Sequence, residues 1–127
     1  MPQRILVADD DPFSLEGLSM LLAVWGYDVE TASDGQIALQ KVWADQPGAV
    51  ITDVVMPMMS GLELLGALRL EKPGMPVIVV TGQSGLETFA RARQEGAYAF
   101  LRKPVDTSRL KSVLASALAK GMETSTP

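Results

Sequence analysis

The chain has 127 residues, 47% of them hydrophobic and 20% charged, with a formal net charge of −4, no cysteine and no histidine. This length favours one globular domain with a substantial core. The missing cysteines and histidines exclude disulfides, thiolate catalysis, structural zinc and a serine–histidine–aspartate triad. A bound metal must therefore have oxygen ligands, which favours Mg²⁺, Mn²⁺ or Ca²⁺.

The sequence has neither a recognisable signal peptide nor an apolar stretch near the roughly 18 residues of a membrane helix. We therefore expect a cytoplasmic protein with no membrane partner. A sequence pI near 4.7 argues against direct nucleic-acid binding by this domain. The acids are concentrated in residues 1–60, which carry nine acidic and two basic residues.

Five short runs predict strands, at residues 5–8, 27–32, 49–51, 77–80 and 99–101. Four of the runs are almost continuously apolar and bounded by Asp, Gly or Pro, as in parallel strands that are buried on both faces. The run at 27–32 instead alternates polar and apolar residues, which is typical of an edge strand.

Segments with helical spacing lie between these strands. The clearest apolar faces are Leu15, Leu18, Leu22 and Trp25, and then Leu110, Val113, Leu114, Ala117 and Leu118. The residues placed to cap a following helix are Asp11, Asp34, Ser60, Ser84 and Asp106. Gly26 is placed to end the first helix.

Strands that alternate with helices predict a parallel sheet with right-handed crossovers. The expected fold is a doubly wound α/β domain, with a five-stranded parallel sheet flanked by five helices. The residues themselves leave the strand order open. We assign residues 1–120 to this domain and residues 121–127 to a flexible C-terminal tail or the start of a linker.

Ligands of open α/β sheets bind outside the carboxyl ends of the strands. The polar residues that follow the predicted strands are Asp9, Asp10, Asp53, Thr81 and Lys103. We expect them to converge, and clustered carboxylates without histidine or thiolate favour Mg²⁺, with Mn²⁺ as a substitute. Taken singly, Asp53, Thr81 and Lys103 are each typical of an ordinary turn or a solvated surface.

Four segments together resemble the receiver domain of bacterial two-component response regulators. They are the Asp9-Asp10 pair after the first strand, Asp53 to Pro57 with Gly61 four residues beyond, the Thr81-Gly82 step, and Phe100 to Pro104. The resemblance extends from Ile5 to about Ala119.

The resemblance implies a flavodoxin-like (CheY-like) sheet of order 2-1-3-4-5 and a role for each site residue. Asp53 would accept a phosphoryl group from a sensor histidine kinase or a phosphotransfer protein. Asp10, Asp53 and the Val55 backbone carbonyl would bind Mg²⁺ directly, and Asp9 through water. Lys103 and Thr81 would contact phosphoryl oxygens, which agrees with the charge that develops in phosphoryl transfer.

The resemblance also implies a switch, in which Thr81 moves toward the phosphoryl group and Phe100 turns inward. A static core phenylalanine is the alternative for Phe100. Val55 and Gln83 lie where hydrolytic water would approach, so an apolar Val55 predicts slow loss of phosphate.

The face of the fourth helix, fifth strand and fifth helix would contact a downstream protein or a fused output domain, or form a homodimer on phosphorylation. The bases expected there are Arg91, Arg93, Arg102, Arg109 and Lys111, which are equally consistent with a solvated surface. The run from Met56 to Met59 is consistent with a kinase-docking surface or with a loop over the next helix.

Three other functions remain as alternatives. A haloacid-dehalogenase-type phosphatase would need a second aspartate two residues after its nucleophile, where this chain has Val55. A receiver-like docking module would not need the complete phosphoryl site. A nucleotide-binding protein would need a glycine-rich phosphate motif, which the sequence lacks. As a receiver, the protein would catalyse only its own phosphorylation and slow dephosphorylation.

Overall fold

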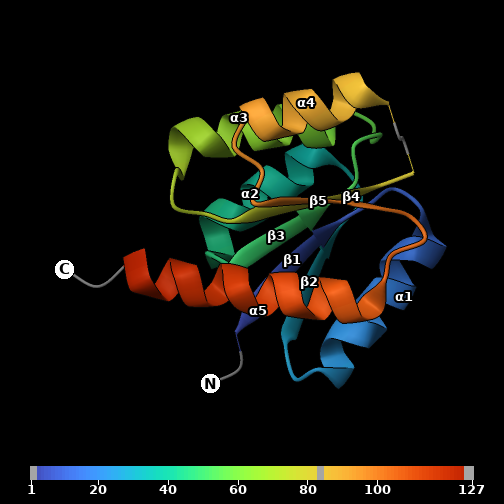
Figure 1. Cartoon of the computed structure of the whole chain (residues 1–127), viewed down its shortest axis with the longest axis vertical. Coiled ribbons are helices and arrows are strands. Elements are labelled where there is room, and N and C mark those ends of the chain that lie inside the picture. The colour runs from blue at the N-terminus through green and yellow to red at the C-terminus, as the bar shows by residue number, and fades with distance from the viewer. Residues whose placement is uncertain (1–2, 83–84, 125–127) are drawn as a thin grey trace.

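Five strands and five helices alternate along the chain, as the sequence predicts (Figure 1). The structure, a computed structural model, describes residues 3–82 and 85–124. The strands are β1 (Arg4–Ala8), β2 (Asp28–Ala32), β3 (Ala49–Thr52), β4 (Val77–Thr81) and β5 (Ala99–Arg102). The helices are α1 (Pro12–Val24), α2 (Gly35–Asp45), α3 (Gly61–Glu71), α4 (Leu86–Gln94) and α5 (Thr107–Thr124). Helix α5 thus continues past residue 120, where the sequence placed the domain boundary.

All neighbouring strands are parallel, and their order is β2-β1-β3-β4-β5. This is the order that the resemblance implies, and β2 is an edge strand as its alternation predicts. The chain runs outward in opposite directions from β1, toward β2 on one side and β3 on the other. The carboxyl ends of β1 and β3 therefore flank the switch point at which ligands of such sheets bind.

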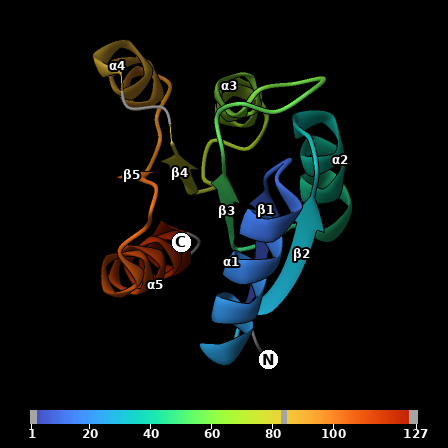
Figure 2. The same ribbon diagram turned by 90° about the vertical axis from the view of Figure 1, so that its right-hand side faces the viewer.

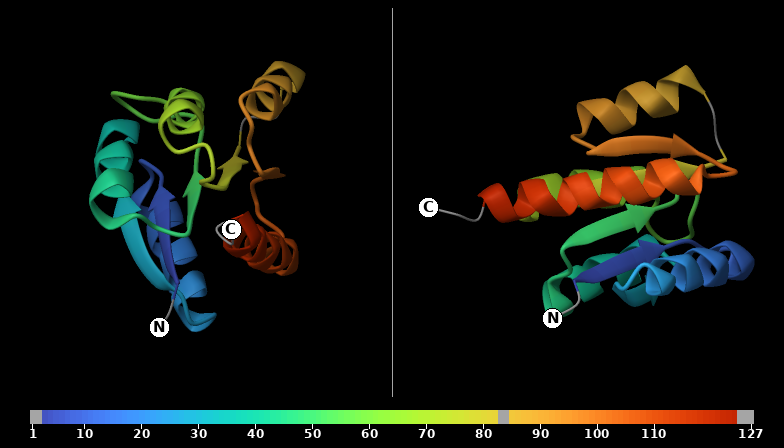
Figure 3. Two further views of the ribbon diagram at one scale, coloured as in Figure 1. Left: turned by 90° about the vertical axis from the view of Figure 1, so that its left-hand side faces the viewer. Right: turned by 60° about the horizontal axis from the view of Figure 1, so that its bottom comes forward.

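Helices cover both faces of the sheet (Figure 2). Alternate residues of each strand point to opposite faces. On β1, Ile5 and Val7 belong to the core under α1 and α5, while Leu6 and Ala8 belong to the core under α2, α3 and α4. Figure 3 shows α3 and α4 on one side of the strands and α5 on the other. Burial on both faces explains why these strands are almost continuously apolar.

The ends of the helices follow the predicted capping residues. The Asp11 side chain accepts a hydrogen bond from the Phe13 N–H, and Asp34 accepts one from Ile37. Ser60 forms a capping box with Glu63, and this contact holds the pKa of the Glu63 carboxyl below its usual value. The Asp106 side chain likewise accepts a hydrogen bond from the Arg109 N–H. Gly26 follows the C-terminus of α1 with a φ of 94°. Helix α4 has Gly85 at its N-cap, and the predicted cap Ser84 lies outside the described residues.

Two glycines hold the loop from β3 to α3 close to its neighbours. A Cβ atom on Gly61 would lie 1.8 Å from the Asp53 carbonyl oxygen, and one on Gly35 would lie 2.2 Å from the Met59 carbonyl oxygen. The Gly35 N–H donates to that Met59 oxygen at 3.1 Å, and the Gly61 N–H donates to the Val54 carbonyl at 2.8 Å. Both glycines are therefore required by close backbone approach and not by a positive φ.

We predict that Gly61→Ala destabilises the fold by about 1–3 kcal/mol, because the added methyl group forces the Asp53 peptide to move. Gly66→Ala in the same helix is the control, since its Cβ would meet only the flexible end of the Glu95 side chain, at 3.2 Å. That variant should gain up to about 1 kcal/mol from helix propensity. Urea unfolding measures both, and equal effects of the two variants would contradict the close-approach argument.

Candidate functional site

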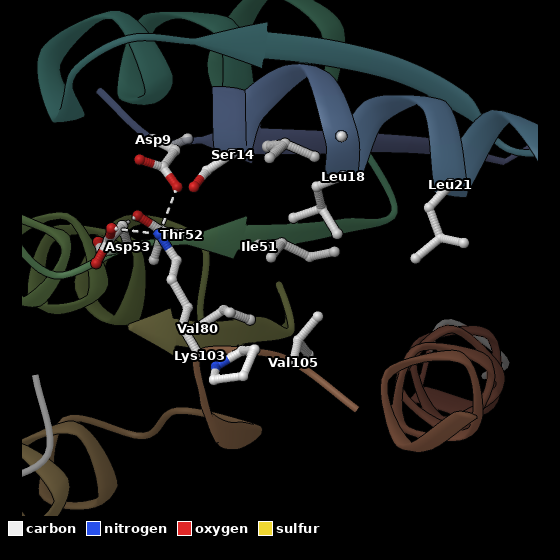
Figure 4. A pocket seen from close by; sticks show the side chains of 14 residues that line it. Asp9, Ser14, Leu18, Leu21, Ile51, Thr52, Asp53, Val80, Lys103 and Val105 are labelled. Carbon is white, nitrogen blue, oxygen red and sulfur yellow. Dashed lines mark hydrogen bonds and ion pairs between the residues drawn. The ribbon is translucent and has the colours of Figure 1, made fainter. Parts of the chain in front are cut away.

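Lys103 links the carboxyl ends of three strands. Its ammonium group donates to Asp9 Oδ2 at 2.8 Å and to Asp53 Oδ2 at 2.9 Å (Figure 4). Asp9 follows β1, Asp53 follows β3, and Lys103 follows β5. The Lys103 backbone N–H also donates to the Thr81 carbonyl at 3.0 Å, which attaches this residue to the end of β4. Residues far apart in the sequence thus meet at one edge of the sheet, as predicted.

The Asp53 carboxylate is held in a fixed direction. Its Oδ1 accepts a hydrogen bond from the Val54 N–H at 2.6 Å, while its Oδ2 accepts from Lys103. The Asp53 backbone N–H donates to the Ala8 carbonyl at 2.9 Å, which continues the β1–β3 pairing by one residue. The side chain remains 13% exposed, so the carboxylate can be reached from solvent.

Burial opposes the charge on Lys103, but the hydrogen bonds and charges of Asp9 and Asp53 outweigh this effect and raise the pKa of its ammonium group. The Lys103 side chain is 28% exposed, whereas those of Asp9 and Asp53 are 6% and 13% exposed. Lys103 is therefore protonated at neutral pH, and it neutralises part of the negative charge of a largely buried carboxylate pair.

Asp10 completes a cluster of three carboxylates. One oxygen each from Asp9, Asp10 and Asp53 lie within 4.8 Å of one another. Asp10 is exposed and Asp9 is buried, so the cluster extends from solvent to the interior. Three carboxylate oxygens at this spacing suit a hard divalent cation such as Mg²⁺. The donor set therefore fits the metal predicted from the sequence.

Thr81 and Phe100 lie on neighbouring strands, on the face of the sheet that α2, α3 and α4 cover. Thr81 ends β4 and is buried, with 1% of its surface exposed. Phe100 is partly buried against the α2–α4 side of the sheet, and its ring meets that of Phe89 edge-to-face at 5.5 Å. This places Phe100 between β5 and α4, and its inward turn stays a prediction.

The side chains of Val55 and the neighbouring methionines differ in burial. Val55 is 53% exposed beside Asp53. Met56 belongs to the core and Met59 packs partly against it, whereas Met58 is 72% exposed. Of these three methionines, only Met58 presents a largely exposed side chain. Gln83, the other residue predicted near hydrolytic water, lies outside the described residues.

The five predicted bases meet different neighbours. Arg102 and Arg109 line a hollow of about 470 Å³ with Leu86, Phe89 and Phe100. Lys111 instead lies 5.8 Å from the Trp25 ring at the end of α1. Arg91 acts electrostatically on Glu63 of α3, and Arg93 lines a separate, smaller hollow. The sequence cannot predict this division, because it depends on which neighbour each helix face meets.

The sequence reasoning overlooked Thr52. This buried residue ends β3, and its hydroxyl donates to the Asp53 carbonyl at 2.9 Å. A polar residue at the end of the apolar run 49–51 was an available signal. Gly35 also supports the site, through the Met59 carbonyl, but no local sequence signal connects it with Asp53.

Comparison with known proteins agrees with this geometry. The model of the response regulator receiver domain family matches residues 5–115. The chain belongs to this family. Membership in this family of two-component receiver domains explains the sheet order. It also explains the acidic pocket, since the family binds Mg²⁺ at such a pocket. The phosphatase and nucleotide-binding alternatives are not supported by this match.

Individual relatives lead to the same family. The receiver is 36% identical over 126 residues to the transcriptional regulatory protein GlrR of Escherichia coli, covering 99% of this chain and 28% of that protein. It is 40% identical to the response regulator MprA of Mycolicibacterium vanbaalenii, covering 82% of this chain and 45% of that protein. The receiver thus spans less than half the length of these curated relatives.

Solved structures match over nearly their whole length. The CheY-like receiver domain protein of Methanospirillum hungatei superposes with a TM-score of 0.92 at 31% identity, covering 98% of this chain and 99% of that one. The chemotaxis protein CheY4 of Vibrio cholerae superposes with a TM-score of 0.85 at 30% identity, covering 92% and 99%. Within the part of this receiver that the structure describes, no helix is both long and apolar enough to span a bilayer.

We predict that Lys103→Met lowers the metal-free stability of the receiver by about 2 kcal/mol, because two largely buried carboxylates lose their shared charged donor. Lys111→Met is the control, since it removes an exposed lysine whose ammonium lies against the Trp25 ring. Urea unfolding in the presence of a chelator measures the difference. If both variants lost the same small amount, the Lys103 contacts would not hold the strand ends together.

Proposed function

We propose that Asp53 accepts a phosphoryl group from a phosphohistidine of a sensor kinase or phosphotransfer protein. A carboxylate oxygen of Asp53 forms a bond to phosphorus as the bond from phosphorus to the imidazole nitrogen breaks, and the electron pair of that bond leaves with the donor. The observation that supports this most directly is the accessible, oriented Asp53 carboxylate beside the Lys103 ammonium. The donor histidine lies outside these 127 residues, which contain none.

The carboxylates of Asp10 and Asp53 would hold Mg²⁺ directly, with the Val55 backbone carbonyl, and Asp9 would bind it through water. Such an ion supplies positive charge to the oxygens of the transferring phosphoryl group. Lys103 would exchange part of its contact with Asp53 for a phosphoryl oxygen. The Thr81 hydroxyl would donate to another, so charge, hydroxyl and metal ligands converge on the developing negative charge.

Phosphorylation would then alter the packing of α4 on the sheet. A move of Thr81 toward the phosphoryl oxygens opens space beside β4, and Phe100 turns inward to occupy it. Because Phe100 already contacts Phe89, this motion would change how α4 packs on β5. Phe100 lacks a hydroxyl, so burial alone would stabilise the inward state.

The changed surface of α4, β5 and α5 would control a downstream protein, a fused output domain or a homodimer in the cytoplasm. Arg102 and Arg109 line the hollow beside Phe100 with one acid, Asp106, and the excess of positive charge supports an acidic or amphipathic partner there. The curated relatives are longer than this chain and are described as transcriptional regulators. Control of an output of that kind is therefore part of the proposal, with no nucleic-acid contact by the receiver itself.

Incubation with Mg²⁺ and a small phosphodonor, such as an acyl phosphate, should add one phosphoryl group that hydroxylamine removes. We expect Asp53→Asn to abolish the label, because an amide oxygen is a poor nucleophile for this step. Asp28→Asn is the control, since it removes an exposed acid at the other end of the sheet. Intact-protein mass spectrometry and peptide mapping measure the modification.

Unlabelled protein that also lacks Mg²⁺ affinity would favour the docking-module alternative. Label that persists in Asp53→Asn would assign the phosphoryl group to another residue. Turnover of many phosphate esters per molecule would support a phosphatase.

Val55→Asn should shorten the lifetime of the phosphorylated receiver about tenfold, equivalent to about 1.4 kcal/mol in the barrier. The amide can orient an attacking water, whereas the exposed valine side chain beside Asp53 cannot. Val24→Asn, an equally conservative change on the exposed face of α1, is the control. The decay of labelled protein in Mg²⁺ gives both rates, and an unchanged rate in Val55→Asn would contradict the role of Val55.

A further inference from the structure

A cavity of about 550 Å³ extends inward from the carboxylate site, between α1 and the segment that follows β5. Its apolar wall comes from helix, sheet and loop: Leu18, Leu21, Ile51, Val80 and Val105 (Figure 4). Pockets that hold small molecules have volumes of roughly 300–1,000 Å³ and are mostly apolar with a few polar groups at one place. Both the size and the lining of this cavity fit that description.

Two small residues on α1 open the cavity. Ser14, Gly17, Leu18 and Leu21 share one face of the helix, at the spacing of residues that meet a neighbouring element. Of these residues, Ser14 and Gly17 in the first turns have small side chains or none. Gly17 is exposed, and an ideal Cβ on it would have no heavy atom within 4 Å, so the cavity opens to solvent beside this residue.

Gly17 has no conformational reason to be a glycine. It lies inside α1 without a positive φ, where glycine costs roughly 1 kcal/mol relative to alanine. It also differs from Gly35 and Gly61, where close backbone approach excludes a side chain. What the residue provides at this position is the open volume itself.

The charge at the carboxylate end of the cavity selects the ligand. Asp9, Asp53 and Lys103 line that end, and Asp10 adjoins it, so carboxylates outnumber the one ammonium group. A cationic group would be attracted to Asp9 and Asp53. An anionic group would instead have to displace both carboxylates from Lys103.

We propose that this cavity binds a primary amine with an apolar tail or ring. The apolar part lies among the leucine, isoleucine and valine side chains between α1 and β3, and the ammonium group lies at Asp9 and Asp53. If Mg²⁺ binds the same carboxylates, as the proposed function requires, amine and metal compete. Such a ligand would then oppose phosphorylation of Asp53.

Calorimetric titration of the metal-free protein with n-octylamine, n-octanol and octanoate tests the binding mode. These probes share one chain length and differ in the charge of the head group at neutral pH. We expect octylamine to bind at least about tenfold more tightly than octanoate, with octanol between them. Equal affinities, tighter binding of octanoate or no binding of any probe would overturn the proposal.

Variants that fill the cavity test its location. Gly17→Leu from the helix side and Val105→Phe from the opposite wall should each weaken octylamine binding about tenfold or more. Ala115→Leu, an equally apolar enlargement on the exposed face of α5, should leave it unchanged. Thermal unfolding of each variant verifies that it is folded. Folded filling variants that retain full affinity would overturn the proposal.

A separate titration distinguishes this inference from the proposed function. Mg²⁺ should weaken the binding of octylamine but not that of octanol. Octylamine bound normally without any Mg²⁺ affinity would support the cavity and count against the metal site. Mg²⁺ affinity without octylamine binding would do the reverse.

Discussion

The contact on which the site depends is the ammonium group of Lys103 between the carboxylates of Asp9 and Asp53. It joins the ends of β5, β1 and β3, which four crossover connections, through α1 to α4, bring to one edge of the sheet. Two largely buried carboxylates at this distance repel unless a cation lies between them. The same arrangement that requires a cation in the resting protein also suits the negative charge of a transferring phosphoryl group. The charges of Lys103, Asp9 and Asp53 thus stabilise the strand ends and also form the candidate site.

The backbone around Asp53 explains why that carboxylate has a defined direction. The Asp53 backbone N–H donates to the Ala8 carbonyl of β1, and its carbonyl accepts from the Thr52 hydroxyl. Gly61 approaches the same carbonyl closely. The proposed phosphoacceptor must be both reachable and oriented, and contacts with the strand ends supply the orientation of Asp53. The loop in turn rests on α2 through Gly35 and Met59.

The two faces of the sheet serve this edge differently. On the side of α2, α3 and α4, side chains form a continuous core, and Phe100 and Phe89 connect it with β5 and α4. On the side of α1 and α5, small residues on α1 leave a cavity that reaches the same carboxylates. The strand ends beside Asp53 therefore contact a packed core on one face of the sheet and a cavity on the other.

The sequence by itself determined the fold class, the alternation of elements and most helix ends, because apolar periodicity and capping residues act over a few positions. It also indicated the polar residues at the strand ends, and the four motifs together indicated the receiver family, which alone supplied the strand order. Only the tertiary structure decided that Lys103 contacts Asp9 as well as Asp53, that the five bases divide among different neighbours, and that Gly17 opens a cavity. These depend on distances between segments that are remote in sequence, and no local pattern records them. The same limit explains why Gly35 was overlooked, since its contact with the Met59 carbonyl exists only once α2 and the loop after β3 are assembled. Thr52 is adjacent to Asp53 in the sequence, and its polar side chain at the end of an apolar run was a local signal.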